Sequence, residues 1–174
     1  IAETIVKHDG GSREAARKRA LDLFERVRIP SPERRLENYP HEMSGGMRQR
    51  AMIALALACN PKVLLADEPT TALDATVQIQ ILLLIRELQR EFGIAVIFVT
   101  HDIGVAVEVA DRVAVMYGGR IVETGPIRDI LRRPRHPYTI GLLKSRAHDA
   151  MTKGTRLDAI PGSPPDLANL PPGC

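Results

Sequence analysis

Residues 43–50 read Met-Ser-Gly-Gly-Met-Arg-Gln-Arg, and residues 62–74 read Lys-Val-Leu-Leu-Ala-Asp-Glu-Pro-Thr-Thr-Ala-Leu-Asp. Ser44 is a suitable N-cap for an alanine-rich helix that runs to about Cys59. Residues 63–66 are wholly apolar, as expected of a strand that is covered on both faces. The two segments therefore combine a helix start, which offers free backbone N–H groups, with a strand that ends in two adjacent carboxylates.

A strand, a helix and a second strand follow one another between residues 63 and 100. Asp74 can cap the helix, and Gly93 lies at its C-terminal stop. Residues 94–100 form a second apolar, β-branched run. The buried stripe of the helix is predicted to contain Val77, Ile81, Leu84 and Leu88. This order and these lengths predict a parallel βαβ unit.

The flanking sequence predicts further helices and one hairpin. An amphipathic helix is expected over residues 12–28, with Ala16, Ala20, Leu23 and Val27 on its buried face. Ser31 is a candidate N-cap for a short helix that begins at Pro32. The other expected elements are a helix at 103–110, a β-hairpin at 112–117 and 120–123 joined by Gly118-Gly119, helices at 127–132 and 138–146, and an extended tail from Ile160.

Composition describes an ordinary globular protein, with 44% hydrophobic, 26% charged and only 3% aromatic residues, so its core should be aliphatic. The net charge of +3 is too small to argue for a nucleic-acid partner. Arginines 132, 133 and 135 are interpreted as a solvated turn. Two cysteines do not make a disulfide framework, which favours a reducing compartment. No apolar run reaches the roughly 20 residues that a membrane span needs.

The carboxylates and one histidine are placed for chemistry on a phosphate. Ligands of open parallel sheets bind at the carboxyl ends of the strands, where Asp67, Glu68 and His101 fall. Asp67 can hold Mg²⁺, and Glu68 is free to orient and deprotonate a water. His101 can act as a polar sensor of phosphate. Ser44, Gly45 and Gly46 start a helix whose N–H groups and dipole suit an anion.

In order and spacing these motifs resemble the ATP-binding cassette (ABC) ATPases. The resemblance implies an α/β fold, a P-loop NTPase-like partial domain made of the helical signature subdomain and the C-terminal half of the parallel-sheet core. Three parts are expected: a helical subdomain with the signature at 1–60, the Walker B, D-loop and H-loop part at 61–125, and a C-terminal extension at 126–174.

The same resemblance implies roles for individual residues, with ATP and Mg²⁺ as cofactors. Asp67 matches the Walker B aspartate that binds the metal, Glu68 the catalytic base, and His101 the switch histidine that touches the γ-phosphate. Residues 71–74 match the D-loop, which contacts the opposite subunit. The residues implied to contact nucleotide, held by the partner's phosphate loop, are Ser44, Gly45, Gly46, Gln49 and Asp74.

The C-terminal segment resembles a narrower group. Residues 133–139, Arg-Pro-Arg-His-Pro-Tyr-Thr, and the proline-rich tail look like the extension of oligopeptide, dipeptide and nickel importers. This implies a peripheral protein on the cytoplasmic face of the cell membrane. Its implied partners are a second nucleotide-binding subunit, identical or related, the permease subunits and, indirectly, a solute-binding protein. Cys174 alone cannot hold an iron–sulfur cluster, so none is expected.

One motif of the family does not occur in the 174 residues: the phosphate loop G-x-x-x-x-G-K-[ST]. We expect it, with the Q-loop glutamine, upstream of Ile1, and we expect this segment alone to hydrolyse ATP poorly. Two alternatives stay open at this stage. One is a non-hydrolysing module that completes a partner's ATP site, and the other is a non-transport ABC-type ATPase of DNA repair.

Overall fold

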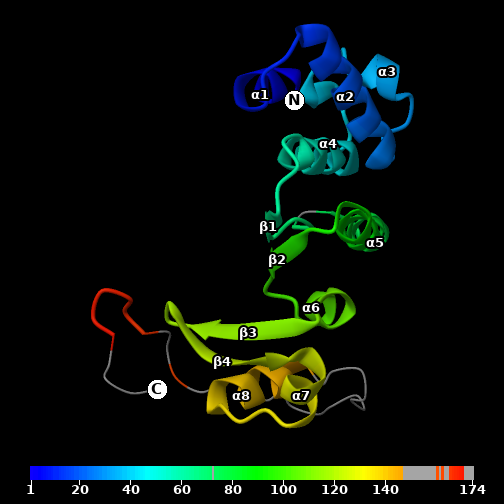
Figure 1. The fold of residues 1–174 in the computed structure, drawn as a ribbon. Helices are drawn as coiled ribbons and strands as arrows, with labels where there is room; N and C mark the ends of the chain where they lie inside the picture. The colour runs from blue at the N-terminus through cyan, green and yellow to red at the C-terminus, as the bar shows by residue number, and fades with distance from the viewer. Residues whose placement is uncertain (72, 147–159, 161, 163–164, 171–174) are drawn as a thin grey trace. The chain divides into compact units, whose positions relative to one another are not determined.

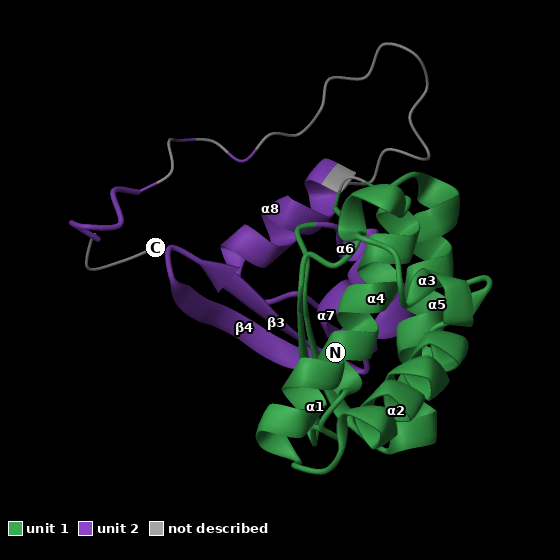
Figure 2. Ribbon diagram, turned by 90° about the horizontal axis from the view of Figure 1, so that it is seen from above, with its two compact units in different colours: residues 1–101 green, residues 102–174 purple. Residues whose placement is uncertain are grey.

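A computed structural model describes residues 1–71, 73–146, 160, 162 and 165–170. The chain forms two compact units, residues 1–101 and 102–174 (Figure 2). Each unit is described by itself. The expected domain boundaries after residues 60 and 125 are not tested by this division and stay predictions.

The first unit joins a group of helices to a two-stranded sheet (Figure 1). Its elements are α1 (Ala2–His8), α2 (Arg13–Arg26), α3 (Pro32–Arg35), the short 3₁₀ helix η1 (Pro40–Glu42), α4 (Gly45–Leu57), β1 (Val63–Asp67), α5 (Ala75–Phe92) and β2 (Ala95–Val99). Strands β1 and β2 pair in parallel, from Val63 opposite Ala95 to Asp67 opposite Val99. The predicted βαβ unit is therefore confirmed.

Side-chain caps fix where the long helices begin. Ser12, Ser44 and Asp74 each accept a hydrogen bond from a backbone N–H in the first turn of the helix that follows. Gly93 ends α5 with a left-handed φ of 61°, a conformation that glycine adopts without strain. The predicted short helix does begin at Pro32 with Ser31 at its N-cap position, but the Ser31 side chain makes no capping hydrogen bond. The φ of Ser31 is 53°, whereas the caps Ser12, Ser44 and Asp74 have extended backbones.

The core of the first unit is aliphatic, as the composition predicts. Leu57 of α4 packs with Ile81, Leu84 and Leu88 of α5, and with Val27 at the end of α2; none of these side chains is more than 1% exposed. Val77 is partly buried against the same cluster. The predicted stripe of α5 is thus the face that the helix buries. Cys59 is half-buried and also packs against this core.

One face of the sheet departs from the prediction. Residues 63–66 were expected to be covered on both sides, but Val63 and Leu65 are 52% and 66% exposed. Ile97 and Val99 of β2 are exposed as well. A wholly apolar strand indicates that both of its faces can be buried, but it does not show that a second layer of structure covers the outer face. Among the described residues, no such layer covers these four side chains.

Helix α1 was not predicted from the sequence. It is only seven residues long, lacks a side-chain cap and buries Ile5 alone. So short a helix depends on its packing against α2, where Ala16 lies in the same core cluster as Ile5.

The second unit is built on a hairpin. Its elements are α6 (Ile103–Val109), β3 (Arg112–Tyr117), β4 (Arg120–Pro126), α7 (Ile127–Arg132) and α8 (Pro137–Arg146). Gly118 and Gly119 both have positive φ, 54° and 75°, as the predicted two-residue turn requires. Strand β4 runs three residues beyond the predicted 120–123. Residue 72 of the D-loop match, residues 147–159 and part of the tail, Cys174 included, lie outside the described residues. No helix in the described ranges is long and apolar enough to cross a membrane.

Candidate active site at the carboxyl ends of β1 and β2

The structure brings Glu68 and His101 into contact. Glu68 follows β1 directly, and its backbone N–H donates to the carbonyl of Val99 at 3.0 Å, which extends the pairing of the two strands. His101 comes two residues after the end of β2. Its Nδ1 lies 2.9 Å from Glu68 Oε1. Because an ionised carboxylate can only accept, Nδ1 carries the proton in this contact.

Thr71 holds the second carboxylate oxygen. Its hydroxyl donates to Glu68 Oε2 at 2.9 Å. The hydrogen bond from His101, then that from Thr71, lower the pKa of Glu68 below its ordinary value, although desolvation acts in the opposite direction. Glu68 is therefore ionised at neutral pH, and each oxygen keeps a lone pair for a further donor such as water.

Glu68 also has an unusual backbone. Its φ is +44°, in the left-handed region that costs a residue with a side chain of the order of 1–2 kcal/mol. The sharp turn is secured by the Glu68–Val99 bond on one side and by the Thr71 N–H, which donates to the Glu68 carbonyl at 3.1 Å, on the other. Strain of this kind gathers at functional sites. Here the strained residue is the one whose carboxylate contacts both Thr71 and His101.

Asp67 is exposed at the last position of β1, opposite Val99. The described residues contain no group of three or more His, Cys, Asp or Glu side chains that could enclose a metal ion. A single carboxylate nevertheless fits Mg²⁺, which keeps several waters and is commonly held by one or two carboxylates together with substrate phosphates. Asp67 could supply such a ligand at the end of β1.

The predicted signature residues line a separate cavity of about 470 Å³. Its lining residues are Arg28, Pro30, Ser44, Gly45, Gly46, Met47, Arg50, Leu73, Asp74, Val77 and Gln80. Ser44 Oγ accepts from the Met47 N–H at 3.3 Å, and Asp74 Oδ1 accepts from the Val77 N–H at 2.9 Å. Both side chains are thus helix caps as well as cavity residues. Gln49 is half-buried and does not line the cavity.

Close packing of α4 against α5 requires a residue without a side chain at position 46, whether or not a ligand binds there. A Cβ atom built on Gly46 would lie 2.8 Å from Val77 Cγ1, whereas one on Gly45 would meet Leu73 Cδ2 at an ordinary 3.5 Å. The first turn of α4 therefore rests directly on the start of α5. The expectation that both glycines serve close approach of an anion leaves out this contact.

Sequence reasoning missed the two arginines of the cavity. Arg50 donates from Nη1 to the carbonyl of Val27 at 2.8 Å and from Nη2 to Gln80 Oε1 at 3.3 Å. Arg28 pairs with Glu87 at 2.6 Å. One signal was available: Arg50 is four residues after Gly46, so the two lie on the same face of α4, one turn apart.

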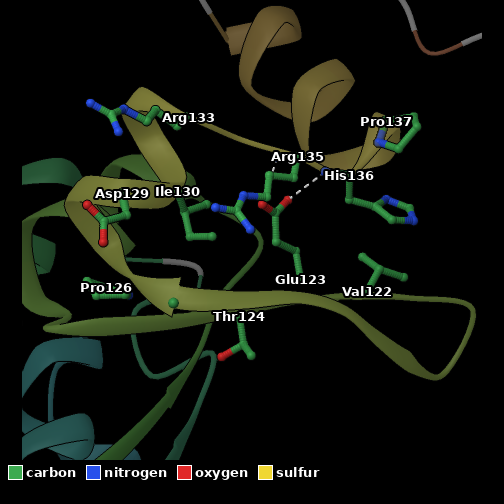
Figure 3. Close-up of a pocket in the computed structure, with 11 residues that line it drawn as sticks. Val122, Glu123, Thr124, Pro126, Asp129, Ile130, Arg133, Arg135, His136 and Pro137 are labelled. Atoms are coloured by element: carbon green, nitrogen blue, oxygen red, sulfur yellow. Dashed lines mark hydrogen bonds between the residues drawn. The ribbon is translucent and has the colours of Figure 1, made fainter.

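The second unit has its own cavity, of about 620 Å³ (Figure 3). Glu123 points from β4 toward the loop before α8, where it accepts from the N–H groups of Arg135 at 2.8 Å and His136 at 3.1 Å. The pKa of Glu123 is lowered most by the nearby Thr139 hydroxyl, then by these two N–H groups. That hydroxyl is buried and falls short of hydrogen-bond geometry with any described group. Arginines 132, 133 and 135 are exposed, as the prediction of a solvated turn requires.

The ABC transporter family matches residues 2–71, and the family of the oligopeptide/dipeptide transporter C-terminal region matches residues 122–174. The chain carries an ABC transporter domain and the C-terminal region of oligopeptide/dipeptide transporters. It is 58% identical, over 99% of its length, to the oligopeptide transport ATP-binding protein OppD of Bacillus subtilis, of which it covers 48%. It is 55% identical over its whole length to a putative peptide import ATP-binding protein of Brucella melitensis, of which it covers 53%. The chain thus spans about half the length of these curated relatives.

Solved ABC structures share the fold. The dimeric ABC transporter cassette MJ0796 matches with a TM-score of 0.61 and 38% identity, over 72% of this chain and 53% of that one. The cbiO1 protein from Clostridium perfringens, part of the ABC transporter complex cbiONQ, matches with a TM-score of 0.66 and 31% identity, over 76% and 51% of the two chains. These matches confirm the predicted α/β, ABC ATPase-type partial domain, and the relatives confirm the predicted resemblance to peptide importers.

Proposed function

We propose that this chain forms the signature and Walker B part of an ATP-hydrolysing subunit that powers peptide import. The observation that carries the proposal is the Glu68 carboxylate, fixed at the carboxyl ends of β1 and β2 by His101 and Thr71 at 2.9 Å each. The names of the relatives favour peptide transport over the two alternatives, a non-hydrolysing module and an ATPase of DNA repair.

The proposed mechanism assigns one task to each side chain. Bound ATP with Mg²⁺ supplies the phosphoryl group and neutralises its charge. Asp67 would hold the metal at the end of β1, and Glu68 would orient the attacking water and receive its proton. His101 donates to Glu68 in this structure, and on nucleotide binding the same ring would donate to the γ-phosphate. Glu68 would then keep the Thr71 bond and direct its other oxygen to the water.

The second half of the proposal concerns partners. Ser44, Gly45 and Gly46, with Asp74 at the same cavity, would contact the phosphates of ATP bound mainly by a second nucleotide-binding subunit, which can be identical or related. Gln49, on the same helix, would contact the nucleotide from outside the cavity wall, which it does not line. The phosphate loop would come from outside these 174 residues. Permease subunits, and through them a solute-binding protein, would place the assembly at the cytoplasmic face of the membrane.

The test is steady-state ATP turnover of the complete gene product and its Glu68→Gln variant. Loss of the general base should lower kcat by about 10²–10⁴-fold, with ATP affinity unchanged within about threefold. Glu33→Gln, at an exposed glutamate of α3, is the matched control and should leave both unchanged. The 174-residue polypeptide alone should turn over ATP poorly. Equal turnover by the Glu68→Gln variant would overturn the proposed role, and tight ATP binding without turnover by the wild type would favour the non-hydrolysing alternative.

A further inference from the structure

We propose that Arg50 is a positioning residue, which fixes the first turn of α4 between α2 and α5 and so sets the geometry in which Ser44, Gly45 and Gly46 are presented. This inference rests on the proposed function, because it concerns how these residues would meet a nucleotide shared with a second subunit. It is carried by the two hydrogen bonds of the Arg50 guanidinium and by its place in the wall of the cavity.

The first hydrogen bond satisfies the end of α2. Val27 is the C-cap of α2, and its side chain is fully buried. The last carbonyls of a helix have no partner within the helix, so a buried helix end needs donors from elsewhere. Arg50 Nη1 provides one for Val27 at 2.8 Å. Because Arg28 turns away with a φ of +58°, the chain leaves α2 sharply and this carbonyl stays within reach of α4.

The second hydrogen bond ties α4 to α5. Arg50 Nη2 donates to Gln80 Oε1, on the second turn of α5. One turn earlier on α4, Gly46 rests against Val77 of α5. Arg50 and Gly46 lie on the same face of α4, so the hydrogen bond and the close packing hold the same two helices together at neighbouring levels.

A planar guanidinium is needed for both contacts. Its N–H donors leave in fixed directions and can serve two acceptors on different helices at once, whereas a lysine ammonium is a single point on a flexible stem. Burial, then the positive charge of Arg28, lowers the pKa of Arg50 below its ordinary value. Burial and the charge of Arg28 thus disfavour a cation at this position, and the directed hydrogen bonds to Val27 and Gln80 offset that cost.

The first unit does not depend on Arg50 alone to hold α2 to α5. Arg26 of α2 pairs with Glu91 of α5, and its guanidinium lies 5.5 Å from the centre of the Phe92 ring. Arg26 is absent from the cavity wall. It therefore provides a matched control: an arginine that links α2 to α5 but does not line the cavity.

The experiment measures ATP-dependent dimerisation of the complete gene product in a Glu68→Gln background, by analytical ultracentrifugation. Arg50→Lys should weaken dimerisation at least tenfold, while the affinity of the monomer for a fluorescent ATP analogue stays within twofold. Arg26→Lys should leave both quantities unchanged. A purely structural role for Arg50 would instead change thermal stability without separating dimerisation from nucleotide binding.

Gln80→Ala provides an independent variant, because Gln80 is exposed and its truncation should not prevent folding. It should weaken dimerisation in the same direction, and the Arg50→Lys and Gln80→Ala effects should not add. If the Glu68→Gln parent dimerises with ATP and both variants dimerise equally well, the role of Arg50 is wrong. If the parent itself never dimerises with ATP, the proposed function fails first.

Discussion

Gly46 and Gly45 are neighbours in the sequence with different structural demands, and the difference can be measured. Gly46→Ala would drive a Cβ to within 2.8 Å of Val77 Cγ1, whereas Gly45→Ala would meet Leu73 at 3.5 Å. Overpacking costs about 1–3 kcal/mol, and alanine regains roughly 1 kcal/mol of helix propensity. We expect Gly46→Ala to lower the free energy of unfolding by about 1 kcal/mol, and Gly45→Ala to leave it unchanged or raise it slightly.

Urea denaturation of both variants checks this expectation. The double variant Gly46→Ala/Val77→Ala should regain the loss caused by overpacking, apart from the separate cost of truncating Val77, which the single Val77→Ala variant measures. Equal stability of the two alanine variants would mean that α4 moves away from α5 without cost. The close packing assigned to Gly46 would then be wrong.

Residue types alone predicted part of the site. Glu68 and His101 could be placed at one sheet edge because both follow apolar strands, and the structure puts them in contact at 2.9 Å. The positive φ of Glu68 could not be predicted, because it accompanies a hydrogen bond between strands: the Glu68 N–H donates to the carbonyl of Val99 in β2. Arg50 was missed for a related reason: its acceptors lie 23 and 30 residues away along the chain.

At the scale of elements, caps and periodicity were reliable guides where a helix was long. Helices α2, α4 and α5 begin at the serine or aspartate that the sequence indicated, and the hairpin turns at its two glycines. Short elements were predicted unevenly: α6 and α7 lie within one residue of their expected ranges, whereas α1 was not predicted. Helix α1 has no cap, and Ser31 does not cap α3, because tertiary contacts decide the backbone of such short segments.

The Glu123 side chain attaches the loop before α8 to β4. Its carboxylate accepts from two successive N–H groups, at Arg135 and His136, and His136 Nδ1 in turn accepts from the Tyr138 N–H at the start of α8. We expect Glu123→Gln to weaken this attachment by roughly 1 kcal/mol, which is modest for bonds to a charged group because the site is partly exposed. Amide hydrogen exchange at Arg135 and His136 should then accelerate about fivefold.

The pH dependence has a definite sign. Because the folded-state pKa of Glu123 lies below its ordinary value of 4.5, the attachment is fully stabilising above that value and is lost as the pH falls through the lower folded-state pKa. The difference in protection between wild type and Glu123→Gln should be constant near neutral pH and shrink below about pH 4.5. Asp129→Asn, in the wall of the same cavity, is the control. Faster exchange in that variant as well, or a difference that grows in acid, would contradict the assignment.

At the scale of the whole chain, the open side of the β1–β2 sheet has a physical consequence. Val63, Leu65, Ile97 and Val99 are 45% to 66% exposed, and a contiguous apolar sheet face of this kind favours association. We expect the purified 174-residue polypeptide to bind the dye ANS and to self-associate at micromolar concentration. Leu65→Thr/Ile97→Thr keeps the β propensity of both positions while removing apolar surface, so it should lower dye fluorescence and restore the monomer.

Sedimentation velocity and ANS titration together check this last expectation. Ile121→Thr is the matched control, because Ile121 is a strand residue of the hairpin with a similar exposure of 61%. If the control suppresses association as well as the double variant does, apolar exposure in general is responsible and the sheet face has no special part. If the wild-type polypeptide is monomeric and binds no dye, the face must be covered in solution by a rearrangement of the chain. The prediction that residues 63–66 are covered on both faces would then be correct.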